Sequence, residues 1–234
     1  MYSKSRRSIV LTLFLLSICS LEISGQSSFV KSGLNGAQFE VNTGFDPSGI
    51  VKSFGGKIGY SIGGILDLGG IFSVEMDEIE SRDVNNTSIG LAYGLMLIKQ
   101  EKRTPFSARI GGAYCYSFID SSIYDEANLQ KEGHGFDVRF SLLRDFNFGE
   151  LVMLRFGLFG EFSSYNYTIL DRSLQSEELQ EFSTQRETGF KYGSVLVFAK
   201  KNTRARTFYL GVEPVMDEDF TLSISTRTGV VLEM

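Results

Sequence analysis

The sequence predicts an all-β protein, a closed antiparallel transmembrane β-barrel of about ten strands that follows a cleaved signal peptide. Bulky apolar residues alternate with small or polar residues in segment after segment, and this period of two is that of a β-strand. Several segments exceed the roughly five or six residues usual in globular proteins and match the roughly 9 to 11 that cross a bilayer as a tilted strand. Beyond residue 25, the sequence has no apolar run near the ~20 residues of a membrane helix.

Residues 1–25 are predicted to be the signal peptide. Three cations precede a mostly apolar run over 9–21, which is too short to cross a bilayer comfortably as a helix. The remaining chain, 26–234, is predicted to be one β-barrel domain, because its length suits a single domain and nothing in it resembles a linker.

Composition and charge exclude several classes of protein. The 20 Phe and 10 Tyr are too many for a disordered chain, and the 25 Gly show no collagen repeat. With a formal net charge of -5 and no Lys/Arg-rich run, the chain lacks the electrostatic footprint that holds phosphates, so we expect no nucleic-acid partner.

The first three strands are predicted over 38–45, 54–62 and 72–77. Each places Phe, Val, Ile or Met on one face and places Gly, Ser, Asn or charged residues on the other. The next two strands, over 87–99 and 106–118, show the longest alternation, with Leu, Ile, Tyr and Phe opposing Gly, Ala and Ser.

The sixth and seventh strands, over 135–142 and 152–162, oppose Phe, Val and Leu to Gly, Asp, Glu and Arg. The last three strands are predicted over 189–198, 207–213 and 220–232. The first of these is the least regular, because two valines fall on its polar face. If the terminal hairpins are misread, eight strands is the alternative.

Turn residues separate these segments. Short turns are expected at six places, where Gly, Pro, Asp, Asn and Lys gather: 46–49, 67–70, 99–104, 145–150, 200–204 and 216–219. Two long connections, 120–134 and 171–187, and an intermediate one, 78–85, alternate with short turns through the middle of the chain. The three prolines are expected at turns or strand ends, where no ladder hydrogen bond is lost.

The bulky face is expected to meet lipid, with the polar face lining a narrow interior. The polar face is rich in Gly, Ala and Ser, which suits a crowded lumen better than a solvent-exposed strand. The charges expected inside balance, six cations to six anions: Lys57, Arg109, Arg139, Arg155, Lys191 and Arg227, and Glu40, Glu75, Asp77, Asp137, Glu161 and Glu213. In a barrel of eight to ten strands these charges are expected to pair across the interior and close it.

The alternation over the mature chain resembles the small outer-membrane β-barrel families of Gram-negative bacteria, of the OmpA/OmpX-like or PorT-like kind. Its most specific part is the C-terminus, where Arg227, Gly229, Leu232 and Met234 resemble the family's assembly signal, although the usual terminal residue is aromatic. The resemblance implies insertion by the outer-membrane assembly machinery, contact with outer-membrane lipids and location in the cell outer membrane.

Acidic residues dominate the connections expected to face outward, and cations dominate the opposite turns. The acidic residues are Asp77, Glu78, Glu80, Asp83, Asp120, Asp125, Glu126, Glu132, Asp171, Glu177, Glu178, Glu181, Glu187, Asp217, Glu218 and Asp219. Such a rim is expected to be a solvated contact surface for a protein at the cell surface, or to bridge to anionic lipids through divalent cations. The connections lack the Asp-x-Asp-x-Asp-Gly spacing of a calcium loop.

We expect no enzymatic activity, cofactor or structural metal. His134 is the single histidine and is expected near a strand start after a loop that contains Ser121, Ser122, Asp120 and Asp125. The sequence therefore predicts a structural or surface-interaction role with a plugged lumen. A narrow channel is the alternative within membranes, and a secreted or periplasmic soluble barrel that binds an apolar ligand is the alternative outside them.

Overall fold

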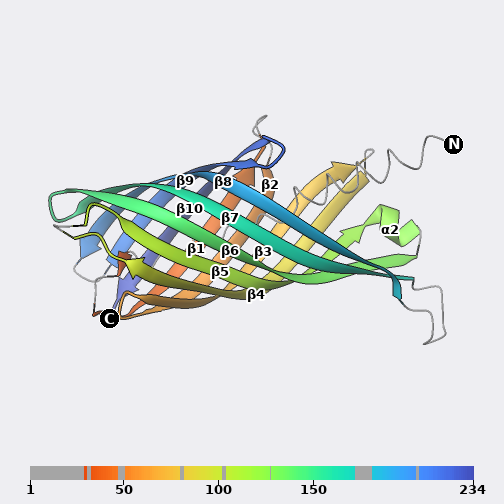
Figure 1. Ribbon diagram of the computed structural model, residues 1–234, viewed down its shortest axis with the longest axis horizontal. Coiled ribbons are helices and arrows are strands. Elements are labelled where there is room, and N and C mark those ends of the chain that lie inside the picture. Colours follow the sequence, from red (N-terminus) through yellow and green to blue (C-terminus); the bar gives the residue numbers. More distant parts are fainter. Residues whose placement is uncertain are drawn as a thin grey trace.

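The computed structural model describes residues 29–30, 33–46, 51–79, 82–101, 104–126, 128–171, 181–203 and 206–234. The predicted signal peptide, 1–25, lies outside these residues. The described chain forms a closed antiparallel barrel, which confirms the predicted fold class (Figure 1). Among the described residues, no helix has the length and apolar character needed to span a membrane.

Ten strands make up the described barrel, as the alternation predicted. A five-residue helix, α2 (Ser122–Glu126), follows the fifth strand. In chain order the strands are β1 (Gly36–Phe45), β2 (Val51–Ile62), β3 (Leu66–Ile79), β4 (Arg82–Ile98), β5 (Ser107–Ser121), β6 (Leu129–Phe148), β7 (Val152–Asp171), β8 (Glu181–Thr203), β9 (Arg206–Asp217) and β10 (Leu222–Glu233).

Each strand pairs with its neighbours in sequence, and the first and last strands close the barrel. β1 and β10 pair from Gly36 opposite Glu233 to Phe45 opposite Ile224. We call the end that holds Gly36 and the C-terminus the turn end, and the end that holds α2 the loop end (Figure 1). Closure leaves neither strand with an unpaired edge, as a barrel in a membrane requires.

One predicted turn is wrong. The turn expected at 67–70 lies instead at 63–65, and β3 begins at Leu66. Gly63 and Gly64 both have positive φ, 62° and 65°, and the Ile65 N–H donates to the Ile62 carbonyl. Two consecutive residues with positive φ are what a type I′ hairpin turn needs, and glycine adopts this conformation without a steric penalty.

The strands are longer at the loop end than predicted. The connection expected over 120–134 reduces to α2 and two residues after it, because β6 already begins at Leu129. Several acidic residues expected in connections therefore lie within strands: Asp77, Glu78, Asp83, Asp120, Glu132, Asp171, Glu181, Glu187 and Asp217. Over 130–134 of β6 and 183–188 of β8 both faces carry polar residues or glycine, so alternation of hydropathy no longer marks the strand there.

Pro214 also departs from the prediction, because it lies inside β9 rather than at a strand end. The β8–β9 ladder pairs Gly193 with Val215 and Leu196 with Val212, and it is interrupted between these pairs. Proline has no N–H to donate, so a break in the ladder beside it is the expected local cost.

The two faces of the wall differ in the sense predicted. Outward-facing large apolar residues occur on all ten strands, and Leu91, at 72% exposed, is among the most exposed of them. We call this outward surface the apolar belt; its members include Phe39, Ile58, Phe72, Leu91, Tyr114, Phe140, Phe156, Phe198, Leu210 and Ile224. Charged and small residues fill the opposite face, so the bulky face points away from the interior.

Candidate functional site

The barrel interior gathers most of the charges that were expected there. Ten of the twelve are buried: Glu40, Lys57, Arg109, Asp137, Arg139, Arg155, Glu161, Lys191, Glu213 and Arg227. Glu75 is half-buried, and the side chain of Asp77 lies outside the described part. A narrow lumen that holds this many charges needs them arranged in opposite pairs.

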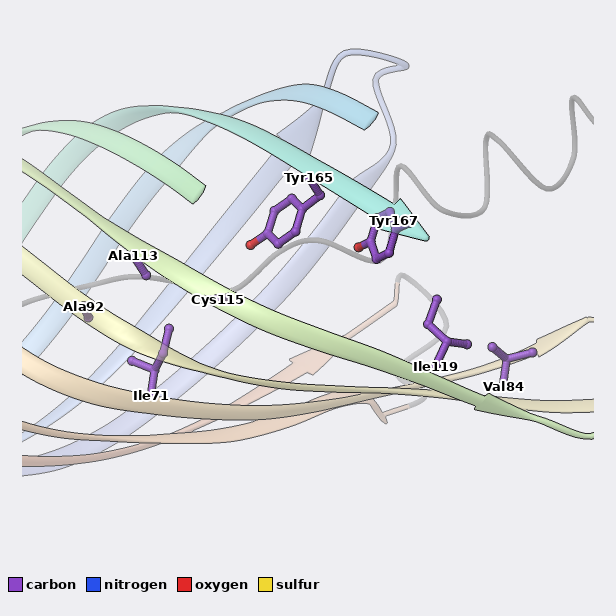
Figure 2. Close-up of a cluster of buried hydrophobic side chains, with 8 residues drawn as sticks. All are labelled: Ile71, Val84, Ala92, Ala113, Cys115, Ile119, Tyr165 and Tyr167. Carbon is purple, nitrogen blue, oxygen red and sulfur yellow. The ribbon is translucent and has the colours of Figure 1, made fainter. Parts of the chain in front are cut away.

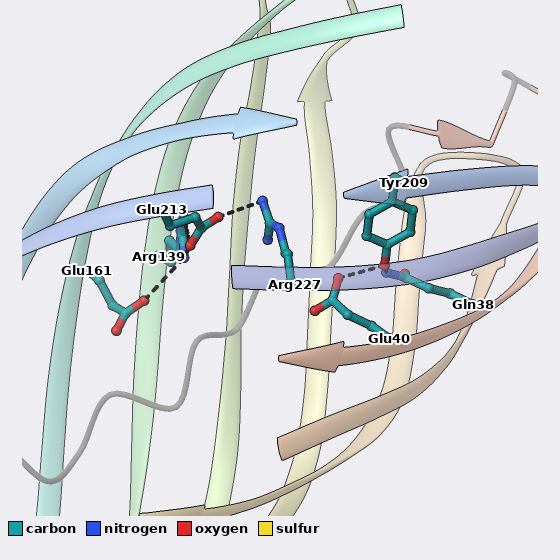
Figure 3. A network of polar contacts seen from close by, with 7 residues as sticks. All are labelled: Gln38, Glu40, Arg139, Glu161, Tyr209, Glu213 and Arg227. Carbon is teal, nitrogen blue, oxygen red and sulfur yellow. Dashed lines mark hydrogen bonds and ion pairs between the residues drawn. The ribbon is translucent and has the colours of Figure 1, made fainter. Parts of the chain in front are cut away.

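Glu213 on β9 is the centre of the main ion-pair cluster (Figure 3). Its side chain is fully buried, and its Oε2 accepts hydrogen bonds from both Nη atoms of Arg139 at 3.1 Å. Its Oε1 lies 2.5 Å from Nη2 of Arg227. Arg139 also reaches Glu161, with Nη1 3.9 Å from Oε2, and its guanidinium lies 3.5 Å from the ring centroid of Phe159. Four strands, β6, β7, β9 and β10, are thus joined across the interior.

Tyr209 links a second carboxylate to the wall (Figure 3). Its hydroxyl donates to Oε2 of Glu40 at 2.6 Å and accepts from Nε2 of Gln38 at 2.9 Å. All three side chains are buried, so these bonds satisfy polar groups that would otherwise be costly inside the barrel.

The structure adds inner-face charges that sequence reasoning missed. Asp67, expected in a turn, is buried and its Oδ2 accepts a hydrogen bond from Nη2 of Arg109 at 2.9 Å. Asp145, also expected in a turn, accepts two hydrogen bonds from Arg155, at 2.6 and 2.7 Å. Both aspartates keep the parity of the inner face, so extending the alternation by five residues before 72 and by three residues after 142 would have found them.

Aromatic residues and an apolar cluster occupy the loop-end side of the interior (Figure 2). We call this the loop-side cluster, formed by Ile71, Val84, Ala92, Ala113, Cys115, Ile119, Tyr165 and Tyr167. The Tyr165 hydroxyl donates to Oδ2 of Asp137 at 3.0 Å. Nearer the loop end, Lys131 lies 4.5 Å from the Tyr167 ring centroid and 3.9 Å from Glu187.

A second apolar cluster lies toward the turn end. This turn-side cluster is formed by Phe29, Val30, Leu143, Val195, Val197, Ala199, Tyr209 and Val231, with Met153 packed against it. Along β7, Glu161 lies between Met153 of this cluster and Tyr165 of the loop-side cluster. The ion pairs around Glu213 thus form a charged layer between two apolar clusters.

The four residues of the proposed assembly signal are divided between the faces of β10. Arg227 is buried and paired with Glu213, whereas Leu232 is on the outward parity and Met234 is exposed. Gly229 faces inward beneath Tyr209, and a Cβ there would overlap the Tyr209 ring and the Phe39 carbonyl. The glycine therefore provides the space in which the Tyr209 ring lies.

The residues weighed for catalysis are not brought together. His134 lies within β6, on the outward face, and its ring centroid is 6.1 Å from that of Tyr114. Ser121 is buried on the inner face at the end of β5, and Asp125 lies in α2. In the described ranges, no group of three or more His, Cys, Asp or Glu residues is placed to hold a metal ion.

Two titratable groups at the ends of the barrel are shifted by their surroundings. Burial raises the pKa of Tyr124 in α2, which packs on the loop-side cluster, and the Glu187 carboxylate raises it further. Burial also lowers the pKa of Lys99, which follows β4 at the turn end, and the Arg155 guanidinium lowers it further. In both groups burial therefore disfavours the charged form.

Comparison with known proteins gives a likeness of architecture. No protein-family model and no curated protein sequence match the chain. The translocator domain of autotransporter NalP from Neisseria meningitidis matches 97% of this chain and 96% of its own, with 12% identity and a TM-score of 0.48. Neisserial surface protein A matches 87% and 98%, with 11% identity and a TM-score of 0.37. The outer membrane protease OmpT from Escherichia coli matches 86% and 96%, with 8% identity and a TM-score of 0.37. At such values the likeness assigns no activity.

Proposed function

We propose that this chain is an outer-membrane β-barrel with a structural or surface-interaction role, whose lumen is closed by paired charges. The observation that carries the proposal is the fully buried Glu213. Its carboxylate pairs with the guanidinium groups of both Arg139 and Arg227, in a layer between two apolar clusters. An apolar belt around a charged interior supports membrane insertion, because lipid favours apolar residues outside and tolerates charges only within.

Closure is supported by the way the charges are held. In a barrel of this strand number, side chains fill the space inside. Arg139, Glu213 and Arg227 are each at most 5% exposed, and breaking such a pair leaves an uncompensated buried charge. An open water-filled pathway through this layer would need the three side chains to separate.

Conductance in planar lipid bilayers tests the proposal. We expect the wild-type protein to show no stable single-channel steps. A triple variant, Arg139→Ala, Glu213→Ala and Arg227→Ala, removes the centre of the charged layer and is expected to conduct, which shows that the assay detects an opened barrel. Stable steps from the wild-type protein would overturn closure and favour the narrow channel.

The loop end is the proposed contact surface. Acidic residues there include Asp125 and Glu126 of α2, and Asp217, Glu218 and Asp219 at the β9–β10 turn. Carboxylates are ligands for hard divalent cations, so such a rim suits bridging to anionic lipids or contact with a surface protein. Mg²⁺-dependent binding to anionic vesicles, lost in an Asp125→Asn, Glu126→Gln variant, would support the lipid contact, and binding unchanged by Mg²⁺ or by the variant would contradict it.

The same proposal includes export to the outer membrane, insertion by its assembly machinery and no catalytic activity. The division of Arg227, Gly229, Leu232 and Met234 between the two faces of the last strand supports the assembly signal. If a Met234→Ala variant inserts as well as a Met234→Phe variant in an assembly assay, the terminal residue has no role in the signal. His134→Ala is expected to leave any hydrolytic activity of the purified protein unchanged.

A further inference from the structure

The chain that precedes β1 folds back into the turn end of the barrel. We call residues 29–30 and 33–35 the N-terminal strap. Phe29 and Val30 are 5% and 2% exposed, although they belong to no strand. Residues just before a first strand are usually poorly ordered, so burial of this degree shows that something holds them.

Phe29 is held between two side chains of the interior wall. Its ring stacks on Tyr209, with centroids 4.9 Å apart and planes at 22°. The Arg155 guanidinium lies 4.4 Å from its ring centroid on a side chain already fixed by Asp145. A buried aromatic ring beside a cation contributes both apolar burial and a cation–π attraction.

The rest of the strap is tied to the rim by hydrogen bonds. Lys99 Nζ donates to the Val30 carbonyl at 2.8 Å. The Gly33 N–H donates to the Gly63 carbonyl at 2.9 Å, and the Gly63 N–H donates to Oδ1 of Asn35 at 2.9 Å. These bonds join the strap to the β2–β3 turn and to the end of β4.

These contacts differ in kind from those of the wall. The ten strands form a closed ladder that does not include Phe29, Val30 or Gly33. A cavity of about 160 Å³ lies beside the strap, lined by Phe29, Val30, Lys99, Met153, Ala199 and Thr207, and it opens to solvent at the β6–β7 turn, where the exposed Asn147, Glu150 and Leu151 also line it. The strap can therefore leave this end without breaking a strand pair.

We propose that the N-terminal strap is a removable closure of the turn end, which covers the inner wall around the buried Ala199 at that end. It adds to the charged layer a second barrier, made by a different part of the chain. The two barriers are made by different residues, because the strap contacts the rim and the turn-side cluster whereas the layer is centred on Glu213.

Cysteine labelling tests this inference in detergent micelles on the exported protein, from which cleavage of the predicted signal peptide removes Cys19. Ala199→Cys, in a Cys115→Ser background, reports through its reaction with a charged maleimide whether the inner wall beneath the strap is accessible. We expect slow labelling with the native strap and a rise of about tenfold or more with Phe29→Ser, Val30→Ser, which removes the burial of a phenylalanine. Lys99→Met, which keeps the apolar stem and removes one tether, is expected to give a smaller rise. Leu34→Ser, at an exposed strap position, is the matched control and should leave the rate unchanged.

Two results overturn the inference: fast labelling of the thiol introduced at position 199 with the native strap, or no rise in the Phe29, Val30 and Lys99 variants. Heat-modifiable gel mobility shows that each variant is folded, and Lys99→Met serves if the double variant is not. The native Cys115, buried in the loop-side cluster beyond the charged layer, separates this inference from closure by ion pairs. Suppose that the Phe29 and Val30 substitutions expose the thiol introduced at position 199 but leave Cys115 unlabelled in a protein with the native cysteine. Closure of the turn end by the strap and closure of the lumen by the charged layer are then both supported. If the substitutions expose both thiols, the strap stands and closure by the charged layer fails.

Discussion

Tyr209 shows how single residues join the separate parts of this interior. Its ring stacks on Phe29 of the strap and lies over Gly229 of the last strand, while its hydroxyl bonds Glu40 and Gln38 of the first. The strap, the barrel seam between β1 and β10, and the buried polar groups therefore share one side chain. Small residues opposite large ones are what allow such packing inside a narrow barrel.

Gly229→Ala tests the space that this packing requires. The added methyl group would overlap the Tyr209 ring and the Phe39 carbonyl, so we expect a loss of about 1–3 kcal/mol in unfolding free energy, as for other overpacked sites. Urea unfolding in micelles, followed by gel mobility, measures the change. Gly70→Ala is the matched control, because a Cβ at this outward position meets no atom closer than 4.0 Å. Equal effects of the two substitutions would contradict the packing argument.

Glu213→Gln tests the ion-pair cluster. The substitution keeps the shape of the side chain but removes the negative charge that the buried Arg139 and Arg227 share, so we expect a loss of roughly 3–5 kcal/mol. The same urea titration measures it. Glu218→Gln, at an exposed turn position, should change the unfolding free energy by less than about 0.5 kcal/mol. The cluster is not a source of stability if both variants unfold at the wild-type urea concentration.

At the scale of the strands, alternation of hydropathy predicted the strand number and the outward face, and it missed strand residues in segments where the two faces do not differ. Strand number and the outward face followed from it, because lipid on one side and a charged interior on the other keep the two faces different. The prediction failed for Leu129 to His134 and for Asp67, where polar residues or a nearby glycine pair resembled a connection. Lys131 and Glu187 were missed for the same reason, although both keep the inner-face parity.

The sequence predicts which residues belong to the candidate site but does not predict which of them form ion pairs with one another. Parity assigns Arg139, Glu213 and Arg227 to the interior, but it cannot say that one carboxylate serves both arginines, since that depends on register and side-chain reach across several strands. The strap was not predictable by periodicity at all, because Phe29 and Val30 lie outside any alternating segment.

The β2–β3 turn gives a prediction at the same scale. Gly63 has a positive φ and its backbone bonds both Gly33 and Asn35, so the turn conformation also positions the strap. We expect Gly63→Asn to be tolerated and Gly63→Val to cost about 1–2 kcal/mol, because a β-branched residue resists the left-handed conformation. Urea unfolding compares the two variants, and similar stabilities would show that the turn conformation is not needed.

For the whole molecule, the arrangement of the two surfaces distinguishes a membrane barrel from a soluble one. A soluble barrel that binds an apolar ligand needs an apolar interior and a polar exterior. Here the exterior carries large apolar side chains on all ten strands, and the interior carries the charged layer. The apolar belt is therefore the surface that tests the two classes of barrel, because it contacts lipid in a membrane barrel and water in a soluble one.

Leu91→Arg tests what the belt contacts. Leu91 is 72% exposed within the belt, so in water an arginine there would be close to neutral. Against hydrocarbon the same change is expected to cost about 2–4 kcal/mol near the middle of the bilayer. Leu151→Arg is the matched control, because Leu151 is similarly apolar and 56% exposed but lies in the β6–β7 turn, where the cost is expected to be near zero. The comparison uses the unfolding free energy of protein inserted into phospholipid vesicles, with gel mobility as the measure of folding. A large loss for Leu91→Arg alone places the belt in lipid, whereas equal tolerance of both arginines would show that the belt faces water and would favour the soluble barrel.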